Sequence, residues 1–225
     1  MEIAAIIPTH GNERKLFTDW QVKRAVEIGF DKIYLIDYTP ISKDFDLFNR
    51  IAVGVNKSIA DGYEFVSIVE DDDFYPLNYL EIIKPLLESN DIVGINQTTY
   101  YHLFSTGWKT MVHPGRSSMF CTSFRTDLFS KLPTHGTPYH DLSIWKFARD
   151  HNDVRFRLTD KEIVLGIKHG NVFGAVGGNG HSMVYPYHDV QLTYLKSRVD
   201  NEAFRFYKSI KSNFQSSWER ANTKR

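Results

Sequence analysis

Four consecutive carboxylates, Glu70-Asp71-Asp72-Asp73, directly follow the apolar run at residues 65–69. Like charges at this density repel one another, so placing them at the end of a strand is costly unless a cation compensates. Carboxylate oxygens suit Mg²⁺ or Mn²⁺, and either ion can also hold phosphate oxygens. The segment is therefore a candidate metal–phosphate site. The alternative is an acidic surface turn at a helix N-terminus, where negative charge is also stabilised.

The residues around the acidic segment alternate between short apolar runs and helical patterns. Buried strands are predicted at residues 3–7, 32–36 and 65–69, and helices at 20–28 and 45–59. Gly29 and the pair Asp61-Gly62 end these helices. This order predicts an α/β fold, with a Rossmann-like, mostly parallel sheet and helices on both faces. Ligands bind at the carboxyl ends of such strands, which is where the acidic segment lies.

The second half of the chain has a less regular pattern. A helix near 80–87 and a strand at 91–95 are followed by a stretch at 98–124 that favours short strands and loops. A helix is predicted at 142–148, strands at 154–158 and 163–167, and a mobile loop at 170–180, which has five glycines. The apolar positions from Leu192 to Phe214 predict one long terminal helix that packs on the body.

Five segments resemble, in order and spacing, the family 2 glycosyltransferases, which are inverting enzymes of the GT-A type. The resemblance covers roughly residues 3 to 150. The segments are Ile6-Ile7-Pro8-Thr9-His10-Gly11-Asn12, Tyr34-Leu35-Ile36-Asp37, the stretch 55–65, Glu70-Asp71-Asp72 with its sequel 75–80, and the stretch 139–148 around Asp141.

The resemblance implies a role for each matching residue. Glu70-Asp71-Asp72 would be the DxD motif, and Asp141 would be the catalytic base that takes the proton from an acceptor hydroxyl. Mn²⁺ or Mg²⁺ would be held by Glu70, Asp72 and His169, and would stabilise the charge that grows on a leaving diphosphate. The nucleotide-sugar donor, most commonly linked to uridine diphosphate, would be bound by Pro8, Thr9, Asp37, Asn56, Asp71 and Asp72.

The chain departs from the family pattern at three positions. Asp37 is followed by Tyr38 where the family has a second Asp, the DxD motif begins with Glu70, and His140 stands where Glu is frequent. Among the histidines, His169 resembles a position that supplies a metal ligand or a phosphate contact. His181 follows the glycine-rich stretch and could move in with a closing loop.

The resemblance also implies a division of one GT-A domain into three parts. Residues 1–98 would be the nucleotide-sugar-binding half, 99–188 a loop-rich acceptor-binding half, and 189–225 a basic C-terminal helix and tail. From residue 190 onward there are eight basic and three acidic residues, whereas the whole chain has no net charge. This end could meet an anionic partner, or it could be a solvated helix face and tail.

Composition sets further limits. The single cysteine, Cys121, excludes an intramolecular disulfide and suits a reducing compartment. No apolar run reaches the roughly 20 residues that a transmembrane helix needs. The N-terminal apolar run stops at Pro8, which is too short for a signal peptide. We therefore expect a cytoplasmic enzyme without a transmembrane segment.

Other functions stay open at this point. The acceptor would be a glycan or a lipid-linked glycan, or alternatively a hydroxylated base in DNA. A nucleotidyltransferase is disfavoured, because residues 9–15 hold one glycine where that class needs a basic glycine-rich loop. A non-catalytic carbohydrate- or nucleic-acid-binding module could instead use four aromatic residues that we expect to be exposed, which are Tyr100, Tyr101, Phe104 and Trp108.

Overall fold

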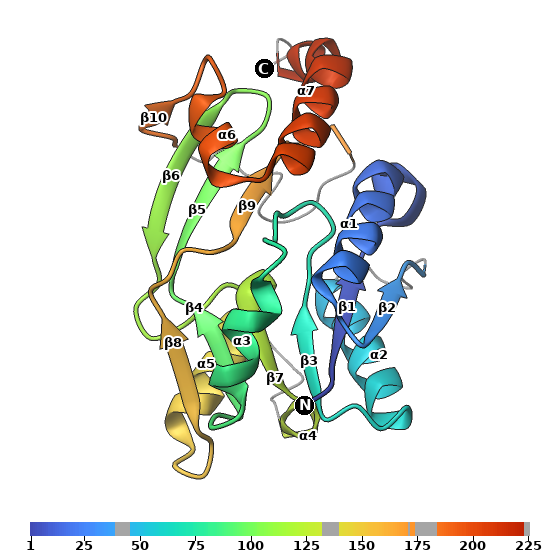
Figure 1. Ribbon diagram of the computed structural model, residues 1–225, viewed down its shortest axis with the longest axis vertical. Helices are drawn as coiled ribbons and strands as arrows, with labels where there is room; N and C mark the ends of the chain where they lie inside the picture. Colours follow the sequence, from blue (N-terminus) through green and yellow to red (C-terminus); the bar gives the residue numbers. More distant parts are fainter. Residues whose placement is uncertain (39–45, 132–139, 171, 174–183, 223–225) are drawn as a thin grey trace. The chain divides into compact units, whose positions relative to one another are not determined.

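The computed structural model describes residues 1–38, 46–131, 140–170, 172–173 and 184–222 (Figure 1). The chain divides into two compact units. Unit 1 consists of Met1–Asp71, Leu77–Gln97 and Val112–Glu162, and unit 2 consists of Asp72–Pro76, Thr98–Met111 and Ile163–Arg225. The chain passes between the units several times, so each unit is assembled from segments that are distant in sequence.

Unit 1 is built on a six-stranded sheet with the strand order β2-β1-β3-β7-β4-β8. Every strand runs parallel to the others except β7, which pairs antiparallel with β3 and β4. The predicted mostly parallel sheet is therefore confirmed. Its strands are β1 (Ile3–Pro8), β2 (Lys32–Ile36), β3 (Phe65–Ile68), β4 (Ile92–Ile95), β7 (Thr122–Arg125) and β8 (Phe156–Thr159).

Helices cover both faces of this sheet, as expected (Figure 1). Helices α2 (Asp46–Ala60), α4 (Thr126–Phe129) and α5 (His140–Asp150) share one core with the strands, which includes Ile6, Ile51 and Trp145. Helices α1 (Lys15–Ile28) and α3 (Tyr79–Leu87) lie on the other face, where the rings of Phe30 and Tyr79 are 6.2 Å apart. The central strands are buried on both sides, which explains their continuous apolar runs.

Unit 2 is built on a four-stranded sheet with the order β10-β6-β5-β9. Its strands are β5 (Gln97–His102), β6 (Gly107–Val112), β9 (Leu165–Lys168) and β10 (Tyr187–His188). β9 runs parallel to β5, and β10 runs antiparallel to β6. Phe74 pairs with Leu165 in an isolated bridge, which attaches the segment Asp72–Pro76 to this unit.

The end of the chain forms two helices rather than the single long helix predicted from the sequence. Helix α6 (Thr193–Arg198) stops at Val199, and α7 (Asn201–Asn222) begins after Asp200. Oδ1 of Asp200 accepts hydrogen bonds from the backbone N–H groups of Glu202 and Ala203, so Asp200 caps a new helix. The apolar spacing continues across this break, which is why the sequence pattern did not reveal it.

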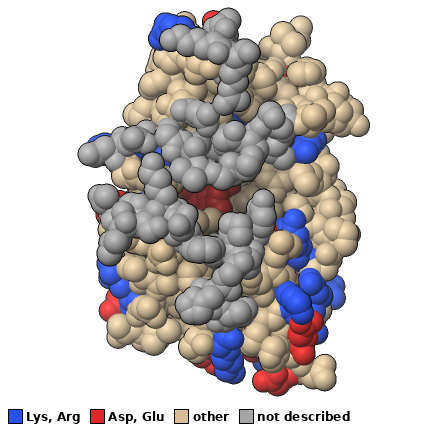
Figure 2. Space-filling view, turned by 180° about the vertical axis from the view of Figure 1, so that it is seen from behind, with Lys and Arg blue, Asp and Glu red and all other residues tan. Residues whose placement is uncertain are grey.

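Charged side chains of both signs are spread over the surface. On the face shown in Figure 2, Lys and Arg lie beside Asp and Glu in several places, and one acidic area lies near the middle. Among the described residues visible in this view, no large surface of a single sign is present. Within the described ranges, no helix is long and apolar enough to cross a membrane.

Candidate functional site

The carboxyl ends of β1 and β3 lie side by side in unit 1. Ile6 is paired with Ile68, and the N–H of Val69 donates to the carbonyl oxygen of Ile6 at 2.9 Å. The N–H of Thr9 donates to the carbonyl oxygen of Ile36 at 3.0 Å, which connects the end of β1 to the end of β2. Parallel pairing therefore places Pro8, Thr9, Asp37 and the start of the acidic segment on one edge of the sheet.

Asp71 is the most tightly held carboxylate on this edge. It is fully buried, and its Oδ1 lies 2.7 Å from a guanidinium nitrogen of Arg14. The hydroxyl of Thr18 donates to Oδ2 at 3.3 Å and lies 2.7 Å from the hydroxyl of Thr9. This network joins the loop after β1 to the loop after β3. Arg14 and Thr18 were not among the site residues predicted from the sequence. The positive charge of Arg14, shortly after the first predicted strand, was the feature of the sequence that could have indicated a partner for the acidic segment.

Gly11 makes the tight turn of the loop after β1 possible. Its φ of +68° lies in the left-handed region, and a Cβ at this position would lie 3.7 Å from the carbonyl oxygen of Asp37. The turn leads into the 3-10 helix Gly11–Arg14, which carries Arg14 to Asp71. Gly11 thus allows the turn that places Arg14 next to Asp71.

The acidic segment continues into unit 2 with Asp72 and Asp73, both almost completely buried. Within the stretch 70–73, ligand oxygens of Glu70, Asp72 and Asp73 lie within 4.8 Å of one another. The N–H of Ile167 donates to Oδ1 of Asp73 at 2.6 Å, so this carboxylate is held by β9. Asp73 therefore has a structural contact in addition to its place in the cluster.

His169 lies beside Asp72 in unit 2. Its Nε2 is 3.1 Å from Oδ2 of Asp72, and both side chains are fully buried. His169 follows directly after β9, so the strand directs it toward the acidic segment. The structure thus brings together two of the three residues predicted to hold a metal, although they are almost a hundred positions apart in the sequence. Carboxylate oxygens with one imidazole nitrogen form a donor set that Mn²⁺ accepts.

Asp141 is in the first turn of α5 in unit 1, where its carboxylate binds the guanidinium group of Arg116. Arg116 belongs to the segment between β6 and β7, together with His113 and Ser118. Burial lowers the pKa of His113, and the positive charge of Arg116 lowers it further, while Asp141 acts in the opposite direction. His113, Arg116 and Asp141 therefore form one electrostatic cluster. The cluster lies at the carboxyl end of β4, where the N–H of His113 donates to the carbonyl oxygen of Asn96.

Comparisons with known proteins identify the architecture. No family model matches the chain, and no curated protein matches its sequence. Among solved structures, S. aureus TarS 1-349 in complex with UDP-GlcNAc matches with a TM-score of 0.53 at 13% identity. The match covers 79% of this chain and 62% of TarS 1-349. The chain has the GT-A fold.

A second matching structure is of the same protein, TarS 1-349, with a different ligand. S. aureus TarS 1-349 in complex with UDP has a TM-score of 0.51 at 13% identity, and the match covers 74% of this chain and 60% of that one. The chain thus spans about three fifths of the TarS structures it matches. At this identity the comparison establishes the GT-A fold alone.

The remaining predicted residues are not all grouped with this edge of the GT-A sheet. Asp37 is exposed and lies directly after β2. Asn56 is also exposed, but it lies on α2 near the end that leads to β3, at the opposite edge of the sheet. His181 and residues 174–180 of the glycine-rich stretch lie outside the described residues.

The expectation that four aromatic residues form an exposed surface is wrong for three of them. Tyr100, Tyr101 and Phe104 are all buried in unit 2. Trp108 is half-buried and lies between Tyr187 and Tyr194, with ring centroids 4.5 Å and 3.9 Å away. The rings that the sequence suggested for sugar or base stacking therefore serve mainly to build the unit.

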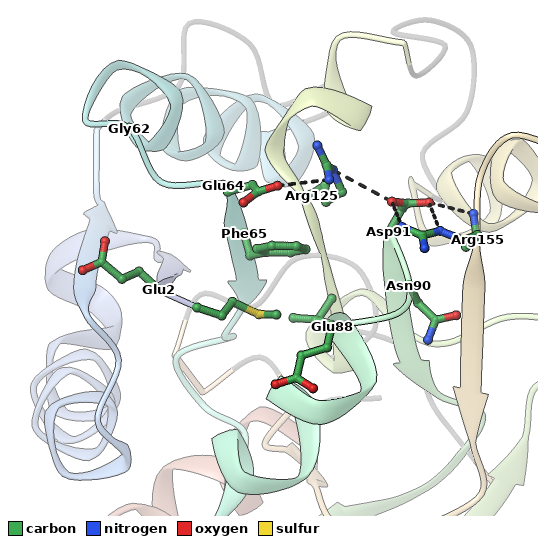
Figure 3. A pocket seen from close by; sticks show the side chains of 11 residues that line it. Glu2, Gly62, Glu64, Phe65, Glu88, Asn90, Asp91, Arg125 and Arg155 are labelled. Carbon is green, nitrogen blue, oxygen red and sulfur yellow. Dashed lines mark hydrogen bonds and ion pairs between the residues drawn. The ribbon is translucent and has the colours of Figure 1, made fainter.

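A cleft of about 530 Å³ lies at the other edge of the GT-A sheet (Figure 3). It is lined by residues at the amino ends of β1, β3, β4 and β8, among them Phe65 and Asn90. Partial burial acts to raise the pKa of Asp91, but hydrogen bonds from Arg155 and the charges of Arg155 and Arg125 outweigh this effect and lower it. The two arginines that line the cleft are paired with acidic residues, Arg125 with Glu64 and Arg155 with Asp91. None of the described residues predicted for the functional site is part of the lining of this cleft.

Proposed function

We propose that this chain is an enzyme that transfers a sugar from a nucleoside-diphosphate sugar, with uridine diphosphate as the nucleotide, to an acceptor hydroxyl. The observation that carries the proposal is the group of carboxylates after β3, at the carboxyl edge of a GT-A sheet. Ligands of open α/β sheets bind at this edge. The fold match to a TarS complex with UDP-GlcNAc supports this choice of donor class.

The donor would be bound along the ends of β1 and β2. Pro8 and Thr9 end β1 and follow it, and the exposed carboxylate of Asp37 follows β2, which suits a contact with the nucleotide. Asp71 would act differently from the direct ligand expected at first, because it is fully buried against Arg14. Its part would be to hold the loop after β1 in the shape that receives the nucleotide.

A divalent cation, Mn²⁺ or Mg²⁺, would be held by Glu70 and Asp72, with His169 beside Asp72. The donor set fits such an ion, because it combines hard carboxylate oxygens with an imidazole that Mn²⁺ accepts. The ion would supply positive charge next to the diphosphate as that group leaves. Buried carboxylates so close together also need a compensating charge in order to stay ionised.

Asp141 would be the general base. It would take the proton of the acceptor hydroxyl while the acceptor oxygen bonds to the anomeric carbon and the bond from that carbon to the diphosphate breaks. Attack opposite the leaving group would invert the anomeric centre. Asp141 stands in the first turn of α5, where the helix dipole favours a negatively charged side chain.

The acceptor would be a glycan or a lipid-linked glycan. A hydroxylated DNA base is the alternative acceptor, and the excess of basic residues after position 190 is compatible with either an anionic membrane surface or a phosphate backbone. A non-catalytic binding module is less well supported, because three of the four aromatic residues suggested for it are buried.

A donor screen tests the proposed function. Purified protein is incubated with nucleoside-diphosphate sugars and candidate acceptors in the presence of Mn²⁺, and release of the nucleoside diphosphate is measured. We expect release with one donor, its loss in excess chelator, and its recovery when Mn²⁺ or Mg²⁺ is added back. Asp72→Asn should abolish release, whereas the exposed Asp127→Asn should not. Sugar binding without release from any donor would favour the binding module.

A further inference from the structure

The segment 113–118 is held in place independently of Arg116. The N–H of His113 donates to Asn96 at 2.7 Å, and the hydroxyl of Ser117 accepts from the N–H of Ile95 at 3.0 Å. These two bonds attach the segment to the end of β4. At the other side, the guanidinium group of Arg149 donates to the carbonyl oxygen of Gly115, which attaches it to α5.

Close packing adds to these hydrogen bonds. A Cβ on Gly94 would lie 2.5 Å from atoms of both Ser117 and Trp145, so the segment and α5 approach β4 as closely as a glycine allows. The indole N–H of Trp145 also donates to the hydroxyl of Thr122 at 3.2 Å. The backbone beside Arg116 is therefore fixed by groups other than its own side chain.

The side chain of Arg116 reaches Asp141 from this fixed backbone. It binds Oδ2 of the carboxylate, and both side chains are mostly shielded, at 25% and 19% exposure. Among the described residues, Oδ1 of Asp141 accepts no hydrogen bond. The planar guanidinium group holds one carboxylate oxygen in a defined direction, so this contact fixes Oδ2 and leaves Oδ1 for a substrate.

We propose that Arg116 is a positioning residue, which holds Oδ2 of Asp141 so that Oδ1 can take the proton of the acceptor hydroxyl. The inference rests on the proposed function. Its physical basis is orientation: a catalytic group displaced by about 1 Å can lose about 10²-fold in rate. In the step itself, the hydroxyl proton moves to Oδ1, the acceptor oxygen bonds to the anomeric carbon, and the electrons of the breaking bond leave with the diphosphate.

A double-mutant cycle tests this role with the full chain, after the screen has identified a donor and an acceptor. Arg116→Ala should lower kcat by about tenfold or more, with the KM for the donor unchanged. Arg116→Lys should recover part of the loss, because it restores the charge without the planar guanidinium group. In an Asp141→Asn background, Arg116→Ala should cause no further loss, because the two residues act as one unit.

The control is Arg157→Ala, which removes one positive charge from an exposed position on β8 and should leave kcat unchanged. Circular dichroism establishes whether each variant is folded. If Arg116→Ala does not fold, Arg116→Lys takes its place in the test. Additive losses in the double variant, or a loss confined to the KM for the donor, would overturn the role of Arg116 alone. A folded wild-type protein that transfers no sugar would overturn the proposed function and this inference together.

Discussion

At the scale of single residues, Asp141→Asn separates binding from turnover. The substitution keeps the size of the side chain but removes its ability to accept a proton. We expect the affinity for the nucleoside diphosphate, measured by calorimetry, to stay near that of the wild type, while transfer falls by about 10²-fold or more. Equal losses of affinity and transfer would make Asp141 a structural residue. Retention of configuration in the product, measured by NMR, would exclude the base role.

Asp71→Asn tests the buried ion pair. The substitution removes the carboxylate charge that pairs with the buried guanidinium group of Arg14, and breaking a buried ion pair typically costs about 3–5 kcal/mol. We expect a loss of that size in the free energy of unfolding in urea. The matched control is Asp19→Asn, because Asp19 pairs with Lys15 on the surface, where such pairs contribute about 0–1 kcal/mol. Equal losses in the free energy of unfolding for the two substitutions would show that the buried pair contributes no more to stability than the surface pair.

His102 predicts a pH dependence of stability. Burial lowers its pKa from 6.5 to about 4, with a smaller contribution from His169, and its Nδ1 accepts a hydrogen bond from the N–H of Ser105. The unfolded chain therefore binds a proton at a higher pH than the folded chain does. It follows that His102 makes the protein lose stability as the pH falls from about 6.5 toward about 4.

Urea unfolding of the wild type and of His102→Gln at about pH 7 and about pH 5 measures this effect. The variant should lose less stability between the two values than the wild type. His188→Gln, at an exposed position, should behave like the wild type. If His102→Gln and the wild type lose the same amount, the protonation of His102 is not linked to folding.

At the scale of elements, the last turns of α7 contribute to unit 2. The ring of Trp218 stacks on Phe104 at 6.1 Å and lies 5.7 Å from His102, so this part of α7 takes part in the packing of unit 2. Deletion from Ser216 should lower the free energy of unfolding by about 1–3 kcal/mol, because it removes a large, partly buried ring.

Deletion from Arg220 onward is the matched control, since it keeps Trp218 and should leave stability nearly unchanged. Urea unfolding of both truncated proteins measures the difference. A similar stability for the two would indicate that the stacking of Trp218 contributes little.

At the scale of the whole molecule, charge is unevenly distributed along the chain although the total is zero. The segment from residue 190 onward carries five positive charges in excess, and the rest of the chain five negative charges. If this segment attracts an anionic acceptor, deletion of residues 220–225, which include Arg220, Lys224 and Arg225, should raise the KM for the acceptor and not that for the donor.

The rise in KM should shrink as salt is added, because at about 0.15 M ionic strength such charges act over about 8 Å. The full-length chain measured at the same salt concentrations is the reference. An unchanged KM for the acceptor at low salt would make this end a solvated helix terminus. If the KM does change, competition by duplex DNA against anionic vesicles identifies the kind of anion.

The sequence by itself determined the parallel sheet, its helices and the place of the acidic segment. Apolar runs that are buried on both faces and helical periodicity are local signals, and a strand's carboxyl end follows from chain direction alone. The break at Asp200 was missed because the apolar spacing continues across it, whereas the end of a helix depends on backbone capping.

Only the tertiary structure decided the partners of the candidate site residues. Arg14 with Asp71 and Arg116 with Asp141 are pairs formed by chain segments that pack together, whereas His169 and Asp72 had been placed in one site by the family resemblance. No local pattern encodes such pairs, because they depend on which strands become neighbours. The insertion of β7 between β3 and β4 is the clearest case. It carries the segment with Arg116 to the edge of the sheet where Asp141 lies in the first turn of α5.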